Sequence, residues 1–397
     1  MVSALMAKDE DDEVSSVDID DDEEEDEDEQ AANDLSKADI VTKYRSAGTI
    51  ANDVLQQITS KISPGAKVVE LCDFGDDKVA ELTGKVYNQK KEGKKVDKGV
   101  AFPTCISINN CVGHYSPLKS DGDLVINEGD TVKIDLGVHI DGYIAVVANT
   151  VVCGGEAPTG RKADVMQAAW VAAECAQRMF QEGATSTDIT EMITKVAKAF
   201  ECTAVEGVLS HQMKKHVIDA NKVIINKAST EHQVKEAKIE ANDVVGFDIV
   251  MSTGEGKPRQ LDQRTTVYKR DLQEKYNLKM KASRAFCSEV SQRFPTLPFT
   301  LRAGDERAWR LGVTECVKHG LFIEYPVLYE KAGETVAQVK FTALLLPSGN
   351  VARITSAPAP DVKSEFKIED EALLEILSRP TDSKKKKKAN KKKKEKE

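Results

Sequence analysis

The chain has 397 residues, of which 40% are hydrophobic and 31% are charged, and its formal net charge is −10 at pH 7. This length allows one large hydrophobic core or two smaller ones. No stretch approaches the ~18 apolar residues of a membrane span, and the first seven residues are too short for a secretory signal, so we expect a soluble, intracellular protein without membrane insertion.

Charge is concentrated at the two ends of the chain. Residues 9–29 contain 16 carboxylates and no basic residue, whereas residues 384–397 contain ten lysines and two glutamates. The remainder is close to neutral. We therefore predict a disordered acidic arm over residues 1–35, a globular domain over residues 36–362, and a C-terminal region over residues 363–397 with a lysine-rich tail.

Hydrophobic spacing predicts helices and strands in alternating groups along the globular domain. Ser36 and Asp39 are typical of a capping box at the first helix, which should end before Ser63. A short helix at 371–377 is predicted to dock against the body. The other predicted helices cover residues 66–92, 161–181, 186–201, 268–294 and 302–319. The predicted strands cover residues 99–110, 131–138, 142–152, 244–250 and 335–346, with 139–141 joining the second and third as a hairpin.

This order indicates an α+β fold with helices packed on one face of a sheet. Residues 257–333 interrupt the second group of strands and are predicted to form a mostly helical insert. The eight cysteines include no C-x-x-C pair, and several lie in apolar runs, so we expect buried, reduced thiols rather than disulfides.

Three ordered motifs carry a resemblance to a known family. They are Gly99–Thr104 with Asn109–Tyr115, Ile134–Gly142, and Ala337–Thr342. Over about residues 36–360 the chain resembles a type II methionine aminopeptidase, whose fold is the pita-bread fold with a helical insert. Segments 114–121, 207–212 and 280–286, together with the lysine-rich tail, are most similar to the proliferation-associated, ErbB-receptor-binding protein family.

The resemblance implies five metal-ligand positions, which in the enzymes are two aspartates, a histidine and two glutamates. In this chain those positions hold Asp135, Val146, Val208, Asp248 and Lys340. A local shift in the alignment would bring His211 to the histidine position instead of Val208. Valine has no lone pair to donate, and one ammonium ~4 Å from one divalent ion costs roughly 8 kcal/mol at an effective dielectric of ~20. We therefore predict no metal site and no other cofactor.

Lys340 also has a second interpretation, in which it stabilises the fold. It would stand in for the metals by pairing with Asp135 and Asp248, because burying two carboxylates without a cation is costly. The resemblance further assigns His114 and His216 to a retained substrate cleft. The alternative is that each imidazole makes local hydrogen bonds that hold the sheet. His139, in the predicted hairpin, is expected to be structural.

The basic tail is the clearest candidate for nucleic-acid binding, because lysine runs attract phosphate backbones by counterion release. A tail that only solubilises the protein is the alternative. Two further basic groups, residues 85–98 and the insert border at Arg259, Arg264, Lys269 and Arg270, are either RNA contacts or solvated surface. The acidic arm either shields the tail, binds a basic partner or is merely solvated. The candidate tail residues are Lys384, Lys385, Lys386, Lys387, Lys388, Lys391, Lys392, Lys393 and Lys394.

The resemblance implies a non-catalytic protein that binds ribosomal RNA and the large ribosomal subunit and regulates growth. It also implies a location in both the cytoplasm and the nucleus, including the nucleolus. We expect a monomer. One alternative is a DNA-binding transcriptional co-regulator with transcription regulators as partners. The other is an active methionine aminopeptidase, which requires that Val146, Val208 and Lys340 be misassigned.

Overall fold

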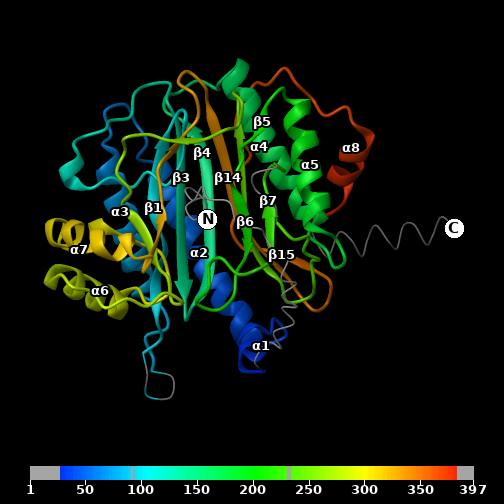
Figure 1. Ribbon diagram of the computed structural model, residues 1–397. Helices are drawn as coiled ribbons and strands as arrows, with labels where there is room; N and C mark the ends of the chain where they lie inside the picture. The colour runs from blue at the N-terminus through cyan, green and yellow to red at the C-terminus, as the bar shows by residue number, and fades with distance from the viewer. Residues whose placement is uncertain (1–26, 91–92, 94, 230–233, 382–397) are drawn as a thin grey trace, which may run out of the picture.

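The computed structural model describes residues 27–90, 93, 95–229 and 234–381 (Figure 1). Its centre is a nine-stranded sheet in which all pairings are antiparallel. β3 (Thr131–Ile140) and β14 (Val336–Leu345) are buried along their whole length, so the polar residues that alternate with apolar ones in both strands are buried as well. The order of neighbouring strands across the sheet is β1 (Lys98–Ile108), β3, β4 (Tyr143–Val152), β14, β8 (Val244–Ser252), β6 (Leu209–Gln212) and β7 (Val223–Ile225). Two short strands lie off this order: β15 (Val351–Arg353) pairs with β14, and β5 (Thr203–Ala204) pairs with β8.

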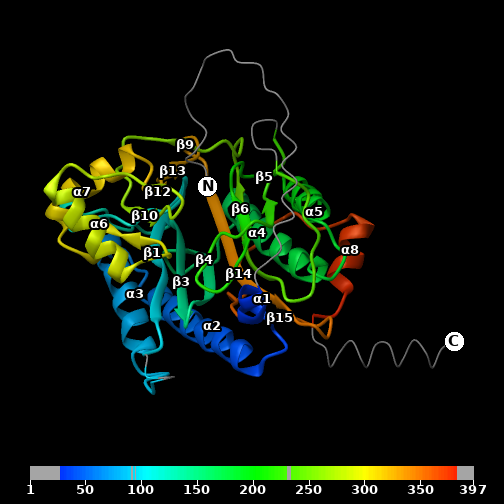
Figure 2. The ribbon, with the colours of Figure 1, turned by 60° about the horizontal axis from the view of Figure 1, so that its bottom comes forward.

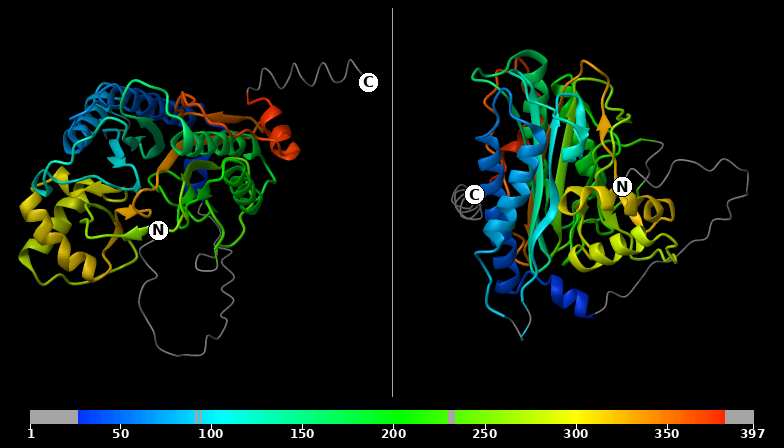
Figure 3. Two further views of the ribbon diagram at one scale, coloured as in Figure 1. Left: turned by 90° about the horizontal axis from the view of Figure 1, so that it is seen from above. Right: turned by 90° about the vertical axis from the view of Figure 1, so that its left-hand side faces the viewer.

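Two helix pairs cover the sheet. α2 (Ala38–Thr59) and α3 (Val68–Thr83) share a hydrophobic core with β1, β3 and β4, and α4 (Gly160–Met179) and α5 (Ser186–Ala199) share another with β8 and β14. Figure 3 shows α2 and α3 on one side of the sheet and the helices of the insert on the other. α8 (Glu371–Ser378) docks on α4 through the buried Leu373, which confirms its predicted role.

Three boundaries differ from the sequence predictions. Order begins earlier than Ser36, because α1 (Glu27–Asn33) is held by hydrogen bonds from the Lys215 amide to Asn33 and from Tyr143 to the carbonyl of Ala32. Ser36 is not the N-cap of α2; that position is Lys37, which makes no side-chain cap. α3 ends at Thr83 rather than near residue 92, since Gly84 follows as its C-cap.

The hairpin between β3 and β4 is tighter than predicted. His139 and Ile140 belong to β3, where they pair with Ile144 and Tyr143, so only Asp141 and Gly142 form the turn. Both turn residues have positive φ, +56° and +80°. Asp-Gly suits such a type I′ turn, which matches the twist of the strands it joins.

The insert contains more strand than the sequence predicts. β10 (Val267–Arg270) pairs with β11 (Phe299–Thr300) and β12 (Phe322–Tyr325), so the predicted helix at 268–294 is wrong in its first half. The helices of the insert are α6 (Lys281–Arg293) and α7 (Glu306–Lys318), and the short 3-10 helix η2 (Leu301–Ala303) lies just before α7. A cluster that includes Phe286, Phe299 and Trp309 forms the core of this unit. Figure 2 shows it grouped beside β1, away from α5 and α8.

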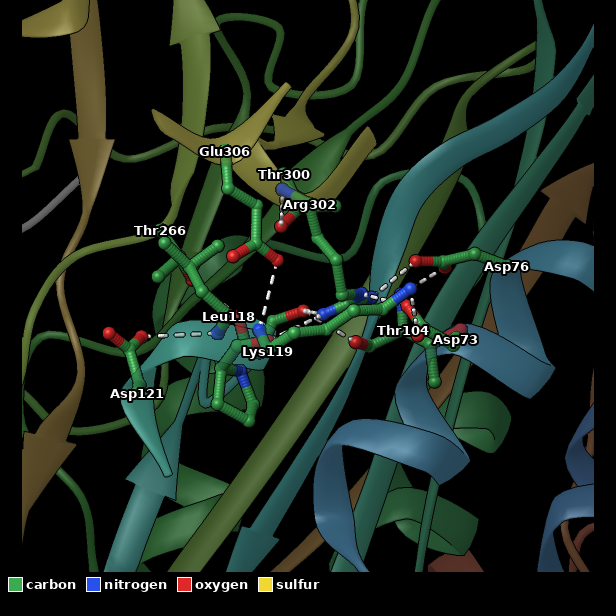
Figure 4. A network of polar contacts seen from close by, with 12 residues as sticks. Asp73, Asp76, Thr104, Leu118, Lys119, Asp121, Thr266, Thr300, Arg302 and Glu306 are labelled. Carbon is green, nitrogen blue, oxygen red and sulfur yellow. Dashed lines mark hydrogen bonds and ion pairs between the residues drawn. The ribbon is translucent and has the colours of Figure 1, made fainter. Parts of the chain in front are cut away.

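A second small sheet joins this unit to the body, where β13 (Leu328–Tyr329) pairs with β2 (Cys111–Gly113) and β9 (Arg259–Gln260). A buried arginine, Arg302, forms a second connection between the insert and the body (Figure 4). The Arg302 guanidinium, 2% exposed, lies 2.7 Å from Asp73 and 2.5 Å from Asp76 of α3, and it donates to the Ser116 hydroxyl at 2.8 Å. Beside it, Glu306 accepts from the backbone of Lys119 in η1 (Lys119–Asp121). These contacts set the position of the insert over the sheet.

All eight cysteines are unpaired in the structure, and all except the half-buried Cys287 are buried, as the apolar runs around several of them predict; the reduced state of the thiols stays a prediction. Within the described ranges, every helix is too short or too polar to cross a membrane. The limits predicted for the insert and the C-terminal region stay predictions.

Candidate functional site: a lysine among carboxylates

Three charged residues lie in one line across four neighbouring strands. In the strand register, Asp135 of β3 faces Ala148 of β4, Ala148 faces Lys340 of β14, and Lys340 faces Asp248 of β8. Residues directly opposite one another in a sheet project from the same face. Because Ala148 has only a methyl group, the long lysine side chain can reach over it to Asp135.

The lysine ammonium bonds to both carboxylates. Nζ of Lys340 lies 2.5 Å from Oδ2 of Asp135 and 3.0 Å from Oδ2 of Asp248. Gln338, two residues earlier on the same face of β14, donates to Oδ1 of Asp248 at 2.8 Å and to Oδ2 of Asp135 at 3.4 Å. Oδ1 of Asp135 is buried and has no hydrogen-bond partner among the described residues. The predicted pairing of Lys340 with both carboxylates is thus present.

Burial and pairing compete at this cluster. Burial opposes the charge on Lys340, but the two carboxylates outweigh it and hold the pKa of the ammonium above its ordinary value. Burial raises the pKa of the Asp248 carboxyl, although Lys340 opposes that shift. The ammonium therefore stays charged at neutral pH and supplies the positive charge that makes buried carboxylates tolerable.

Asp248, Gln338 and Lys340 of this cluster line a pocket between the sheet and the insert, with a cavity volume of about 130 Å³. Val146 and Val208 stand in its wall, as do Asp248 and Lys340. Val146 is 6% exposed, and a Cβ on Gly246 would lie 3.0 Å from its Cγ2. The valines make this wall apolar at positions where the resemblance implies metal ligands.

His114 and His211 also line the pocket. The ring of His114 packs against Phe102 and Tyr325, and burial together with the Lys340 charge lowers its pKa to about 4. The ring of His211 is buried with no hydrogen-bond partner for Nδ1, and burial lowers its pKa to about 4. Both imidazoles are therefore neutral at pH 7. In the sequence, nothing identified His211 as a pocket residue except its position three residues after Val208.

His216 is absent from the pocket lining, contrary to its assignment to a retained cleft. Its backbone amide donates to the carbonyl of Gly142, and its ring lies 6.4 Å from that of His139. His216 itself adopts a positive φ of +61°. His216 and His139 thus pack together at the β3–β4 turn.

The residues at the five implied positions do not fit a pair of divalent ions. Two are valines without a lone pair, and the lysine places its ammonium in the space between the only two carboxylates. Taking His211 as the ligand in place of Val208 leaves Val146 and Lys340 at two other ligand positions, so the site still does not fit two ions. The described part of the chain contains no group of three or more histidine, cysteine, aspartate or glutamate side chains that could hold a metal ion.

Several candidate basic residues have other partners. Lys269 forms an ion pair with Asp219 and is largely buried, so it is not free to contact RNA. Lys98 bonds to the carbonyl of Val86 and to Asn88. Arg259 remains exposed in β9, and Arg264 is nearly half exposed, 3.6 Å from Asp121. The nine candidate lysines of the tail lie outside the described residues.

Comparison with known proteins identifies the family to which the fold belongs. The family model described as "Metallopeptidase family M24" matches residues 42–257. The chain belongs to the M24 metallopeptidase family. Within this family it is 50% identical over 354 residues to "ERBB-3 BINDING PROTEIN 1" of Solanum tuberosum, covering 89% of this chain and 90% of that protein. It is 44% identical to "Proliferation-associated protein A" of Dictyostelium discoideum, covering 88% and 91% of the two chains.

The chain is also similar to two other proteins. "Curved DNA-binding protein" of Schizosaccharomyces pombe is 38% identical, covering 87% of this chain and 91% of that protein. Among solved structures, "Structure of a thermophilic Arx1" superposes with a TM-score of 0.82 at 33% identity, covering 87% of this chain and all of that one. The pita-bread fold and the proliferation-associated, ErbB-3-binding branch expected from the sequence are confirmed.

Proposed function

We propose that this M24 protein is a non-catalytic RNA- and ribosome-binding regulator of growth, in which the peptidase fold serves as a scaffold. One observation carries the loss of catalysis. The Lys340 ammonium lies 2.5 Å and 3.0 Å from the two remaining carboxylates, where a dinuclear peptidase needs two cations. Without such ions, no group at these positions would activate a water or polarise a peptide carbonyl.

Binding is assigned to charged segments outside the pocket. The tail at residues 384–397 carries ten lysines, and each lysine that neutralises a phosphate releases counterions. Exposed Arg259 and the nearly half-exposed Arg264 add positive charge at the edge of the insert. We propose the large ribosomal subunit and its RNA as the partner, with the protein acting as a monomer in both the cytoplasm and the nucleus.

The test is salt-dependent co-sedimentation with purified large ribosomal subunits and, in parallel, binding to duplex DNA. The full chain is compared with a variant lacking residues 383–397 and with a length-matched variant in which the nine candidate tail lysines are glutamines. We expect both variants to bind subunits more weakly. Their salt dependence should fall by about 0.7–0.9 in log–log slope for each lost phosphate contact.

A variant with arginines in place of the nine lysines is the matched control, because it keeps the charge and should keep the binding. Unchanged affinity and slope in the glutamine variant would exclude the tail as the binding element. Failure of the full chain to sediment with subunits at any salt concentration would refute ribosome binding.

A DNA-binding co-regulator is the second candidate, and the name of the Schizosaccharomyces pombe relative favours it. A basic tail alone attracts RNA and DNA alike. Tighter binding to duplex DNA than to subunits at the same salt concentration would support this candidate over the first.

A further inference from the structure

The two helices of the insert approach each other unusually closely. A Cβ placed on Gly312 of α7 would lie 2.4 Å from Cβ of Phe286 and 2.9 Å from the carbonyl oxygen of Ala282, both on α6. No real side chain tolerates such distances, so only glycine permits this crossing. The backbone of α7 therefore lies directly against α6 at Gly312.

Two cysteines meet at this crossing. Cys316 lies one turn beyond Gly312, and its sulfur is 3.5 Å from the Gly312 carbonyl and 3.9 Å from the carbonyl of Ser283 on α6. Ser283 and Cys287 are four residues apart and therefore share a face of α6. Because the Cys316 sulfur lies against the carbonyl of Ser283, Cys287, one turn further along the same face of α6, is its neighbour across the two helices, and each thiol shifts the pKa of the other.

Cys287 differs from the other seven cysteines, Cys316 included, in its exposure and in the direction of its pKa shift. Cys316 is buried, whereas Cys287 is half-buried and within reach of solvent. Contact with the Cys316 thiol lowers the pKa of Cys287 to about 6 against the opposing effect of burial, with the Ser291 hydroxyl and Arg270 helping. Burial raises the pKa of each of the six cysteines outside the pair.

We propose that Cys287 and Cys316 form a reversible redox pair, in which a peroxide oxidises Cys287 and Cys316 closes a disulfide between α6 and α7. The Cys287 thiolate attacks one peroxide oxygen, so that an S–O bond forms, the O–O bond breaks and the departing hydroxide becomes water by taking up a proton. The Cys316 sulfur then attacks the Cys287 sulfenic acid. An S–S bond forms, the S–O bond breaks, and the Cys316 proton leaves with the hydroxide as a second water.

The two thiols together lose two electrons, and the peroxide gains them. A thiol reductant returns both cysteines to the starting state by exchange. The oxidised protein has α6 and α7 joined covalently beside the core that contains Phe286 and Trp309. The insert therefore opens less often when oxidised, because the two helices can no longer separate independently.

The test exposes the full chain to hydrogen peroxide, blocks the remaining thiols and maps tryptic peptides without reduction. Residues 285–293 and 311–318 should appear as one linked peptide, with two fewer free thiols per chain, and a reductant should separate them. In Cys316→Ser the linked peptide should be absent and a dimedone adduct should accumulate on Cys287. In Cys287→Ser neither product should form, whereas Cys153→Ser, which alters a buried cysteine elsewhere, should behave as the parent.

Amide hydrogen exchange over residues 281–318 supplies an independent measurement, with slower exchange expected in the oxidised parent and no change in Cys287→Ser. A dimedone adduct on Cys287 in the parent without any linked peptide would overturn the pairing. Linkage of Cys287 to a different cysteine would do the same. Resistance of Cys287 to both reactions at peroxide concentrations that oxidise other thiols would overturn its role as the nucleophile.

Discussion

Replacing Lys340 by methionine removes the charge while keeping the length of the side chain. At an effective dielectric of ~20, each ammonium–carboxylate contact near 3 Å is worth about 5 kcal/mol before desolvation and carboxylate repulsion are subtracted. Breaking a buried pair by removing one partner has a net cost of about 3–5 kcal/mol. For an ordered domain of this size, that loss lowers the melting temperature by about 4–7 °C.

The assay is thermal and urea unfolding of the parent, Lys340→Met and two controls. Lys85→Met removes an exposed lysine, 62% accessible and paired with Glu81, and should cost less than about 1 kcal/mol. The triple variant Asp135→Asn, Asp248→Asn, Lys340→Met removes every charge of the cluster. It should recover most of the lost stability, because no unpaired charge remains buried.

Lys340→Met should also acquire a pH dependence. Without the ammonium, the opposing effect of Lys340 is lost, so burial raises the folded-state pKa of the Asp248 carboxyl further above its unfolded value. The folded state then binds more protons than the unfolded state, so the variant is closest to the parent near pH 4 and falls further behind as pH rises to 7. Lys340→Met melting like the parent at pH 7 would refute the idea that the lysine balances the buried carboxylates.

Three further changes test other parts of the account. Lys133→Met should stabilise the protein at pH 7 by about 1–3 kcal/mol, because the buried Lys133 ammonium bonds to two backbone carbonyls and no carboxylate among the described residues, and burial lowers its pKa to about 8. Unfolding at several pH values should show this advantage shrinking between pH 8 and 10, because Lys133 loses its proton at a lower pH in the folded parent than in the unfolded chain. Gly142→Ala should lower stability by more than about 1 kcal/mol in urea unfolding, because Gly142 has φ +80° and a Cβ would lie 2.4 Å from the His216 ring. Arg302→Met should lower the free energy of unfolding by about 3–5 kcal/mol and speed hydrogen exchange across the insert. Arg302→Lys should not restore the stability, because an ammonium cannot bond to Asp73 and Asp76 together as the planar guanidinium does.

Much of the fold follows from hydrophobic spacing. The helices α2, α4 and α5 and the buried strands lie close to their predicted ranges, because each has a long apolar face with a clear period. The errors fall where tertiary contacts override local pattern. β12 lies within a segment for which no strand was predicted, and it pairs with β10 across more than fifty residues of sequence. α1 is polar and is held by contacts to Tyr143 and Lys215 that no local pattern reveals.

The charged cluster was predictable, since strand alternation and the family motifs place Asp135, Asp248 and Lys340 on one face. The role of Gln338 was available from the same alternation, as it lies two residues before Lys340. The Asp141-Gly142 turn was also readable, since that dipeptide is the strongest short hairpin signal. His211 could not have been placed, because its position in the pocket depends on the pairing of β6 with β8.

The central claim is that Lys340, with Val146 and Val208, has displaced the metal chemistry of the M24 peptidases. The most direct test is the number of divalent ions bound per purified full-length chain after equilibration with cobalt or manganese and desalting, measured together with methionine release from a short peptide. We expect far less than one ion per chain and no release. A stoichiometric pair of ions accompanied by release of the terminal methionine would contradict the account.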